Sequence, residues 1–86
     1  MDCIRLKIVS PSGVLLERDV RSVRLPTPEG SVGVLADHAP MLCAVGKGEI
    51  RFRFEGGEDS LSVAGGIACV EDNLLTVLAD GRAEEA

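Results

Sequence analysis

The chain has 86 residues, a formal net charge of −5 at pH 7, and 45% hydrophobic residues, among which Phe52 and Phe54 are the only aromatic ones. A chain of this length forms a single domain. Its acidic balance disfavours nucleic acid as a partner, because like charges repel, and two aromatic rings are too few to stack bases or sugars.

The sequence holds no apolar run long enough to cross a bilayer and no basic cluster for an anionic membrane, so we expect no direct membrane insertion. Met1-Asp2-Cys3 lacks the features of a signal peptide, which favours a location inside the cell. Three widely spaced cysteines in apolar segments predict buried thiols in a reducing compartment: Cys3, Cys43 and Cys69.

Apolar and polar residues alternate through most of the chain, which is typical of half-buried β-strands. The alternation is clearest where Ile4, Leu6 and Ile8 share one face, and again where Ile50 and Phe52 do. The predicted strands are residues 3–9, 14–17, 20–25, 31–35, 50–55, 60–64, 67–70 and 74–78. Seven to nine short strands with regular turn signals predict an all-β fold, a flattened antiparallel sandwich or barrel.

Glycine and proline mark the breaks between these strands. The two prolines in residues 26–30 predict a break, because proline cannot donate to the ladder of a central strand. Gly33 indicates a bulge or a close backbone approach, and Gly65-Gly66 indicates a bulge or kink. A phosphate-binding loop is disfavoured there, since neither a helix signal nor a Gly-Lys-Ser/Thr motif follows.

Two segments depart from the strand pattern. Asp37 can cap a helical turn that runs to Met41, since proline is tolerated in a first turn. Residues 82–86 have a helix-favouring composition. The region from Gly30 to Val45 carries more apolar side chains than a solvent-exposed loop needs, so we expect part of it to contact a partner.

Few residues offer chemistry. His38 is the only ready general base, and Cys43 follows five residues on, so a Cys–His hydrolase is one alternative function, although a loop histidine is favoured. Lys47 stands between two glycines, somewhat like the modified lysine of biotin or lipoyl carriers, which gives a ligand-binding or carrier domain as the other alternative. The acidic pairs fall in turns, where side chains bond backbone amides. We predict no catalytic residue, cofactor or metal ligand.

Residues 30–42, GSVGVLADHAPML, resemble the "EGELGVLPGHAPLL" signature of the epsilon subunit of rotary (F-type) ATP synthases. Four more segments resemble that family in the same order: Ile8–Pro11 ("VVSP"), Lys47–Arg51 ("PGxLRV"), Ala64–Val70 ("SGGFLEV") and Leu75–Asp80 ("VTVLAD"). The resemblance therefore covers nearly the whole chain.

This resemblance implies a β-sandwich of about ten strands over residues 1–80, followed by the start of a linker or helical tail at 81–86. It implies a non-catalytic rotor subunit of the central stalk, peripheral at the cytoplasmic face of a bacterial membrane, that couples ion translocation to ATP synthesis. The loop from Glu29 to His38 would face the c-ring, and His38–Cys43 would lie near the gamma subunit. The implied partner-binding residues are Glu29, Ser31, His38, Ala39, Pro40, Met41 and Leu42.

The sequence departs from the family pattern at two places. Ser31 stands where many relatives carry an acid, so we expect the gamma-facing segment to be the stronger contact. The family usually continues into a C-terminal helical hairpin that restrains ATP hydrolysis, whereas this sequence ends at Ala86. We therefore expect no inhibition through such a hairpin.

Overall fold

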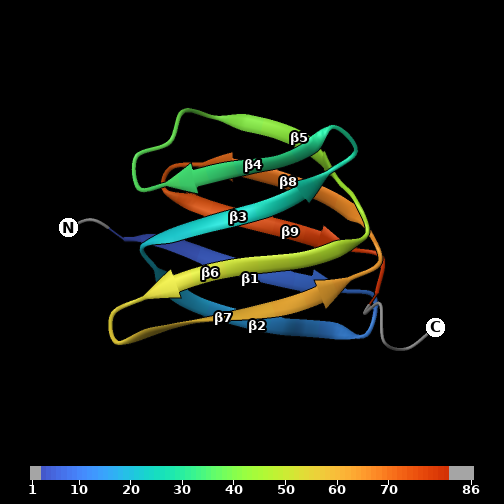
Figure 1. The fold of residues 1–86 in the computed structure, drawn as a ribbon, viewed down its shortest axis with the longest axis horizontal. Helices are drawn as coiled ribbons and strands as arrows, with labels where there is room; N and C mark the ends of the chain where they lie inside the picture. Colours follow the sequence, from blue (N-terminus) through green and yellow to red (C-terminus); the bar gives the residue numbers. More distant parts are fainter. Residues whose placement is uncertain (1–2, 82–86) are drawn as a thin grey trace.

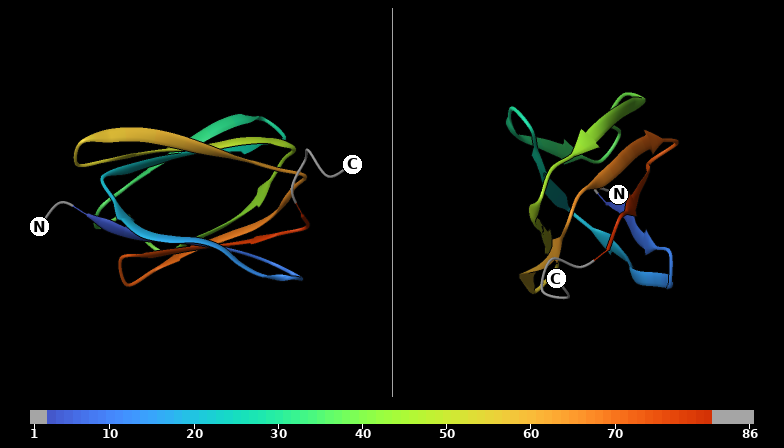
Figure 2. Two further views of the ribbon diagram at one scale, coloured as in Figure 1. Left: turned by 90° about the horizontal axis from the view of Figure 1, so that it is seen from below. Right: turned by 90° about the vertical axis from the view of Figure 1, so that its right-hand side faces the viewer.

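A computed structural model of the chain describes residues 3–81, and within them nine strands form two sheets packed face to face (Figures 1 and 2). The strands are β1 (Ile4–Ser10), β2 (Gly13–Val20), β3 (Ser22–Thr27), β4 (Gly30–Leu35), β5 (Met41–Val45), β6 (Gly48–Phe54), β7 (Gly57–Val63), β8 (Gly66–Glu71) and β9 (Leu74–Ala79). The described residues include no helix that could cross a bilayer. The predicted all-β sandwich is confirmed.

One sheet has the strand order β2-β1-β9-β8-β5 and the other the order β4-β3-β6-β7. All neighbours are antiparallel except β1 and β9, which run parallel in the middle of the five-stranded sheet. The alternation within single strands gave no sign of this parallel pair, since pairing direction depends on how distant segments meet. The nine strands agree with the periodicity; a tenth is not found within residues 3–81.

The core is a layer of aliphatic side chains between the sheets, to which Phe52 adds the one buried aromatic ring. Ile4, Leu6 and Ile8 are completely buried, as the alternation predicted. Burying apolar surface is the main force that drives folding, at about 25 cal/mol per Å². Because side chains alternate along a strand, fixing this inward set also fixes which residues face outward.

The predicted helical turn from Asp37 to Met41 is wrong. Asp37 has a left-handed backbone with φ of 62°, and the amide of His38 donates to the carbonyl of Leu35 at 3.2 Å, so the chain makes a tight turn there. The residue before a proline avoids helical angles, which extends the chain ahead of Pro40. Met41 then opens β5, whose buried and exposed residues alternate.

The predicted break at residues 26–30 is partly wrong, because Pro26 lies inside β3 and pairs with Ser31 of β4. Proline is tolerated there because the pairing of β3 with β6 ends at Arg24 and Arg51, so no ladder partner needs the missing amide. The turn itself is confined to Pro28 and Glu29.

The prediction that all three cysteines are buried is also wrong. Cys69 is exposed, while Cys3 and Cys43 are partly buried. The reason is the alternation in β8, where Ala68 and Val70 point into the core and Cys69 between them points out. At Gly33 neither the predicted bulge nor the predicted close backbone approach is found, since the β3–β4 register is regular and the group that lies over Gly33 is the side-chain guanidinium of Arg24.

The chain passes from β7 in one sheet to β8 in the other through Gly65 and Gly66, with φ of 134° and 151°, which confirms the kink. A Cβ on Gly66 would overlap the carbonyl oxygen of Leu78 and lie 3.0 Å from the Cα of Ala79. Gly66 therefore allows the start of β8 to pair with the end of β9.

We predict that Gly66→Ala destabilises the domain by at least about 3 kcal/mol, because the backbone strain and the clash with β9 act together. Gly13→Ala is the control, since Gly13 has φ of 133° but nothing within 4 Å of its would-be Cβ. Urea unfolding measures both. Equal losses for the two variants would show that the clash with Leu78 contributes nothing.

Candidate partner-binding surfaces

The sequence-predicted partner residues form two groups at opposite ends of the sandwich. Glu29 lies in the turn before β4, and His38 lies in the loop after it (Figure 1). The six residues of β4 separate the groups by about 20 Å. The segment from Glu29 to His38 is therefore a turn, a strand and a second turn, and the strand agrees with the one predicted at residues 31–35.

The His38 group, residues 38–42, is the short connection from β4 in one sheet to β5 in the other, and Leu42 at its end is exposed. His38 is half-buried, and its Nδ1 lies 2.7 Å from the carbonyl oxygen of Ala39. Ala39 and Pro40 are exposed, Met41 packs against the core, and Leu42 is 73% exposed. Within this group, Leu42 offers the apolar contact surface.

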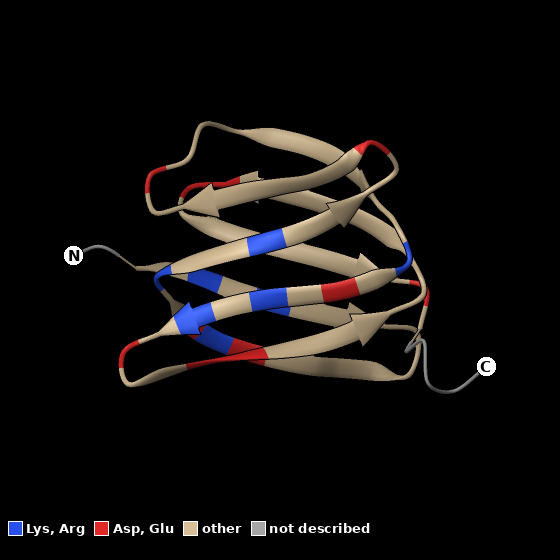
Figure 3. Cartoon of the chain, viewed as in Figure 1, with Lys and Arg blue, Asp and Glu red and all other residues tan. Residues whose placement is uncertain are grey.

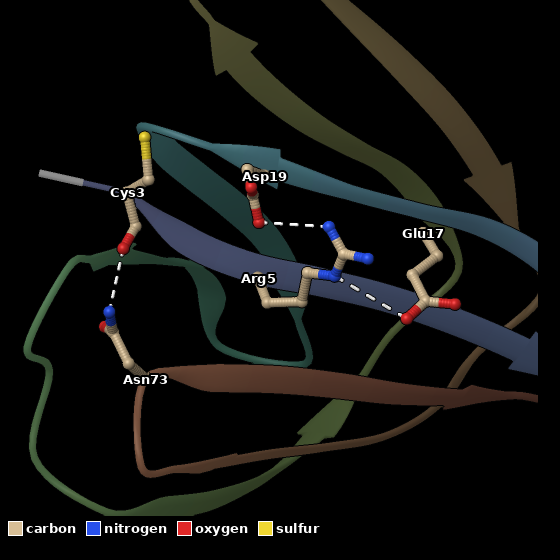
Figure 4. A network of polar contacts seen from close by, with 5 residues as sticks. All are labelled: Cys3, Arg5, Glu17, Asp19 and Asn73. Carbon is tan, nitrogen blue, oxygen red and sulfur yellow. Dashed lines mark hydrogen bonds and ion pairs between the residues drawn. The ribbon is translucent and has the colours of Figure 1, made fainter. Parts of the chain in front are cut away.

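Asn73, in the turn between β8 and β9, fixes the position of this loop, and Figure 4 shows its hydrogen bond to Cys3. Its Oδ1 accepts a hydrogen bond of 2.8 Å from the amide of Asp37, and its Nδ2 donates one of 2.8 Å to the carbonyl of Cys3. Its own carbonyl accepts from the amide of Arg5 at 3.1 Å. One side chain thus joins the β4–β5 loop, the β8–β9 turn and the start of β1.

The outer face of the five-stranded sheet carries a continuous row of apolar side chains. The strand registers place five residues side by side across the sheet: Val14, Val9, Leu78, Ile67 and Ala44. Beside this row, Leu42 is paired with Cys69, and Leu74 lies further along β9. We call these eight residues the apolar face. Of the large apolar side chains that are exposed in residues 3–81, all but Leu35 lie on it.

Charged groups border the apolar face at the Asn73 end. Arg5 forms ion pairs with Glu17 at 3.5 Å and with Asp19 at 3.1 Å (Figure 4). All three side chains are well exposed, so these pairs add little to stability. An apolar centre with a charged border is the usual make-up of a surface that binds another protein.

The two alternative functions find no support in this geometry. In the described residues, the His38 ring makes its hydrogen bond to Ala39 and none to Cys43. Burial, together with the nearby carboxylate of Glu29, raises the pKa of the Cys43 thiol, which disfavours the nucleophilic thiolate. Lys47 lies where the chain crosses from β5 to β6 between the sheets, so it is not at a hairpin tip.

The described residues also hold no group of three or more histidine, cysteine or acidic side chains that could bind a metal. The two packed sheets and their aliphatic core define a small β-sandwich domain. The chain belongs to the family described as "ATP synthase, Delta/Epsilon chain, beta-sandwich domain", which matches residues 3–86.

Relatives with curated names support this family. The ATP synthase epsilon chain of Granulibacter bethesdensis is 47% identical over 77 residues, covering 87% of this chain and 56% of the relative. The epsilon chain of Desulfitobacterium hafniense is 37% identical, covering 87% and 57%. The epsilon chain of Propionigenium modestum, described as sodium ion specific, is 35% identical, covering 93% of this chain and 58% of the relative. The chain thus spans less than two thirds of the length of these relatives.

Solved structures agree on the fold. A chain in the mitochondrial ATP synthase of Euglena gracilis, solved as OSCP/F1/c-ring, matches 90% of this chain and 50% of its own length, with a TM-score of 0.83 and 28% identity. A chain in the central stalk and c-ring of the Tetrahymena thermophila mitochondrial enzyme matches 88% and 62%, with a TM-score of 0.75. At 18% identity, the second match shows the fold alone.

The sequence contains a signal for the apolar face that the period-two pattern of single strands does not reveal. β5, β8 and β9 contain nearly continuous apolar runs, MLCAV, GIACV and LLTVLA, in place of strict alternation. Such runs are typical of strands that are covered on both faces. Within residues 3–81, nothing covers the outer face of these strands.

We predict that Asn73→Gly loosens the β4–β5 loop without breaking the β8–β9 turn. Glycine keeps the left-handed φ of 63° at this position but makes no side-chain hydrogen bond. Losing two hydrogen bonds should cost about 1–2 kcal/mol of stability. Hydrogen exchange at the amide of Asp37 should become at least about tenfold faster. Asp72→Gly, next door with φ of 53°, is the control. Unchanged exchange at Asp37 would refute the role of Asn73.

Proposed function

We propose that this domain is a non-catalytic part of the rotor of an ATP synthase, which helps couple ion translocation to ATP synthesis. The family membership and the names of the relatives support this role. The apolar face is the observation that carries it, because a large exposed apolar patch on a sheet is typical of a surface that a partner covers.

The partner of the apolar face is the gamma subunit. Contact through a whole sheet face suits a part that must turn together with its neighbour, since a rigid sheet transmits force without bending. Leu42 links this face to the segment His38–Leu42 that the sequence resemblance assigned to gamma. The contact then centres on Leu42, Ile67 and Leu78, and the His38 loop lies at its margin.

The c-ring contact falls at the end of the sandwich that carries Glu29. Pro28 and Glu29 form an exposed turn there, and Ser31 follows on β4. The hydroxyl of Ser31 accepts a hydrogen bond of 3.1 Å from Nη1 of Arg24, so this hydroxyl already has a partner within the domain. Glu29 therefore supplies the negative charge at this end, in place of the acid that many relatives carry at position 31.

This arrangement implies a peripheral position on the membrane, with the domain held by the ring and by gamma. In a bacterial cell, that position is the cytoplasmic face of the plasma membrane. The domain works without a cofactor of its own, since its task is mechanical attachment.

We predict that Leu78→Glu weakens binding to the gamma subunit by at least about tenfold, because it puts a charge into the centre of an apolar contact. Ile67→Glu should act in the same way. Both side chains are at least half exposed, so the fold should tolerate the changes. Isothermal titration of the domain with gamma measures the affinity.

Leu35→Glu is the matched control, because Leu35 is 61% exposed but lies on the other sheet. It should leave the affinity for gamma unchanged. Equal losses from Leu35→Glu and Leu78→Glu would contradict the placement of gamma on the apolar face. No binding by the unaltered domain would contradict the proposed function itself.

A further inference from the structure

The outer face of the four-stranded sheet differs from the apolar face, because it carries a hollow of about 590 Å³ lined by charged side chains. Three small residues, one each on β3, β4 and β7, leave the space open: Ser22, Gly33 and Ser60. Three arginines line it: Arg24 on β3, and Arg51 and Arg53 on β6. Figure 3 shows basic residues in the middle of β3 and along β6, with acidic ones on β7.

Two of these arginines lie in an unfavourable pair. Arg24 and Arg51 are directly opposite each other on adjacent strands, where like charges repel. Their side chains reach different partners: Nη1 of Arg24 donates to Ser31 at 3.1 Å, and Nη2 of Arg51 lies 3.4 Å from Glu49. Within residues 3–81, Arg24 makes no ion pair with a carboxylate. An anion between the two guanidinium groups would remove the repulsion.

The existing ion pairs in the hollow are weak enough to yield to such an anion. Arg53 lies 3.7 Å from Glu58, and both side chains are about three-quarters exposed. Exposed pairs of this kind contribute little, because water and salt screen them. A guanidinium offers a planar fork of donors that matches a phosphate or carboxylate group.

We propose that this hollow binds a single phosphate group between Arg24 and Arg51, with Arg53 at its side. The rim selects for a compact anion, since Glu49, Glu58 and Asp59 also line the hollow and would repel a chain of phosphates. The site lies on the opposite side of the sandwich from the apolar face, so gamma can be bound at the same time. It does not depend on the proposed rotor function.

The test is a titration of the isolated domain with inorganic phosphate at constant ionic strength, observed through the arginine side-chain NMR signals. The signals of Arg24 and Arg51 should shift and saturate in the millimolar range. Arg24→Gln should weaken binding by about tenfold, because it removes charge-assisted hydrogen bonds. Arg5→Gln removes the same charge from the other sheet and should leave binding unchanged.

A second variant fills the hollow without changing any charge. The backbone of Gly33 is outside the left-handed region, and a Cβ there would lie 3.4 Å from Nη2 of Arg24, so Gly33→Val fits the strand. It should weaken phosphate binding as Arg24→Gln does. Non-saturating shifts at all arginines, or the same affinity in Arg24→Gln and Arg5→Gln, would overturn the site.

Two further anions define the ligand. O-phosphoserine should bind at least as well as phosphate if the natural ligand is a phosphoryl group on a larger molecule, and more weakly if the ligand is the free ion; either result is consistent with a phosphate site. Tripolyphosphate should bind no more tightly than phosphate, because of the acidic rim. Affinity that rises with the charge of the anion would contradict a site for a single phosphate group.

Discussion

The aliphatic layer between the two sheets determines which residues of each strand point out to the surface of this domain. Ile4, Leu6, Ile8, Leu75 and Val77 are fully buried in the five-stranded sheet, and their alternation sends every other residue of β1 and β9 outward. A shift of any strand by one residue would turn its core set into the solvent. The outward apolar residues are therefore held outside by the same packing that stabilises the fold.

The two outer faces that result have opposite chemistry. The five-stranded sheet presents Val9, Leu78 and Ile67 in one apolar row, with the Arg5 ion pairs towards the Asn73 end. The four-stranded sheet presents arginines and acids around small residues. A partner that excludes water suits the first face, and a small hydrated ligand suits the second. Two connections between the sheets keep them packed face to face. Asn73 holds the β4–β5 loop, and Gly66 allows the close approach of β8 to β9 after the β7–β8 crossover.

Much of the fold could be predicted from the sequence because period-two alternation reports directly on burial. It placed the inward residues of β1, β3 and β6 correctly, as Leu6, Val23 and Ile50 show. It failed where local patterns compete: Asp37 and Pro40 suggested a helical turn, but the chain instead turns sharply and continues as β5. The parallel pairing of β1 with β9 depends on contacts between the ends of the chain, which no local pattern encodes.

The candidate site was predicted less completely. Of the segment His38–Leu42, only the last residue belongs to the apolar face, and the other apolar residues come from strands distant in sequence. Asn73 could not be found, because its role depends on Asp37 and Cys3 being brought close by the fold. The resemblance put Glu29 and His38 in one segment facing the c-ring, but the length of β4 places them at opposite ends of the sandwich.

The most direct measurement of the central claim uses Cys69, which is exposed on the apolar face next to Leu42. In a variant that keeps only this cysteine, through Cys3→Ser and Cys43→Ala, a maleimide should react readily with the isolated domain. Bound gamma should slow the reaction by at least about tenfold, because a packed contact excludes the reagent. An intact complex in which Cys69 reacts as fast as in the free domain would contradict the account.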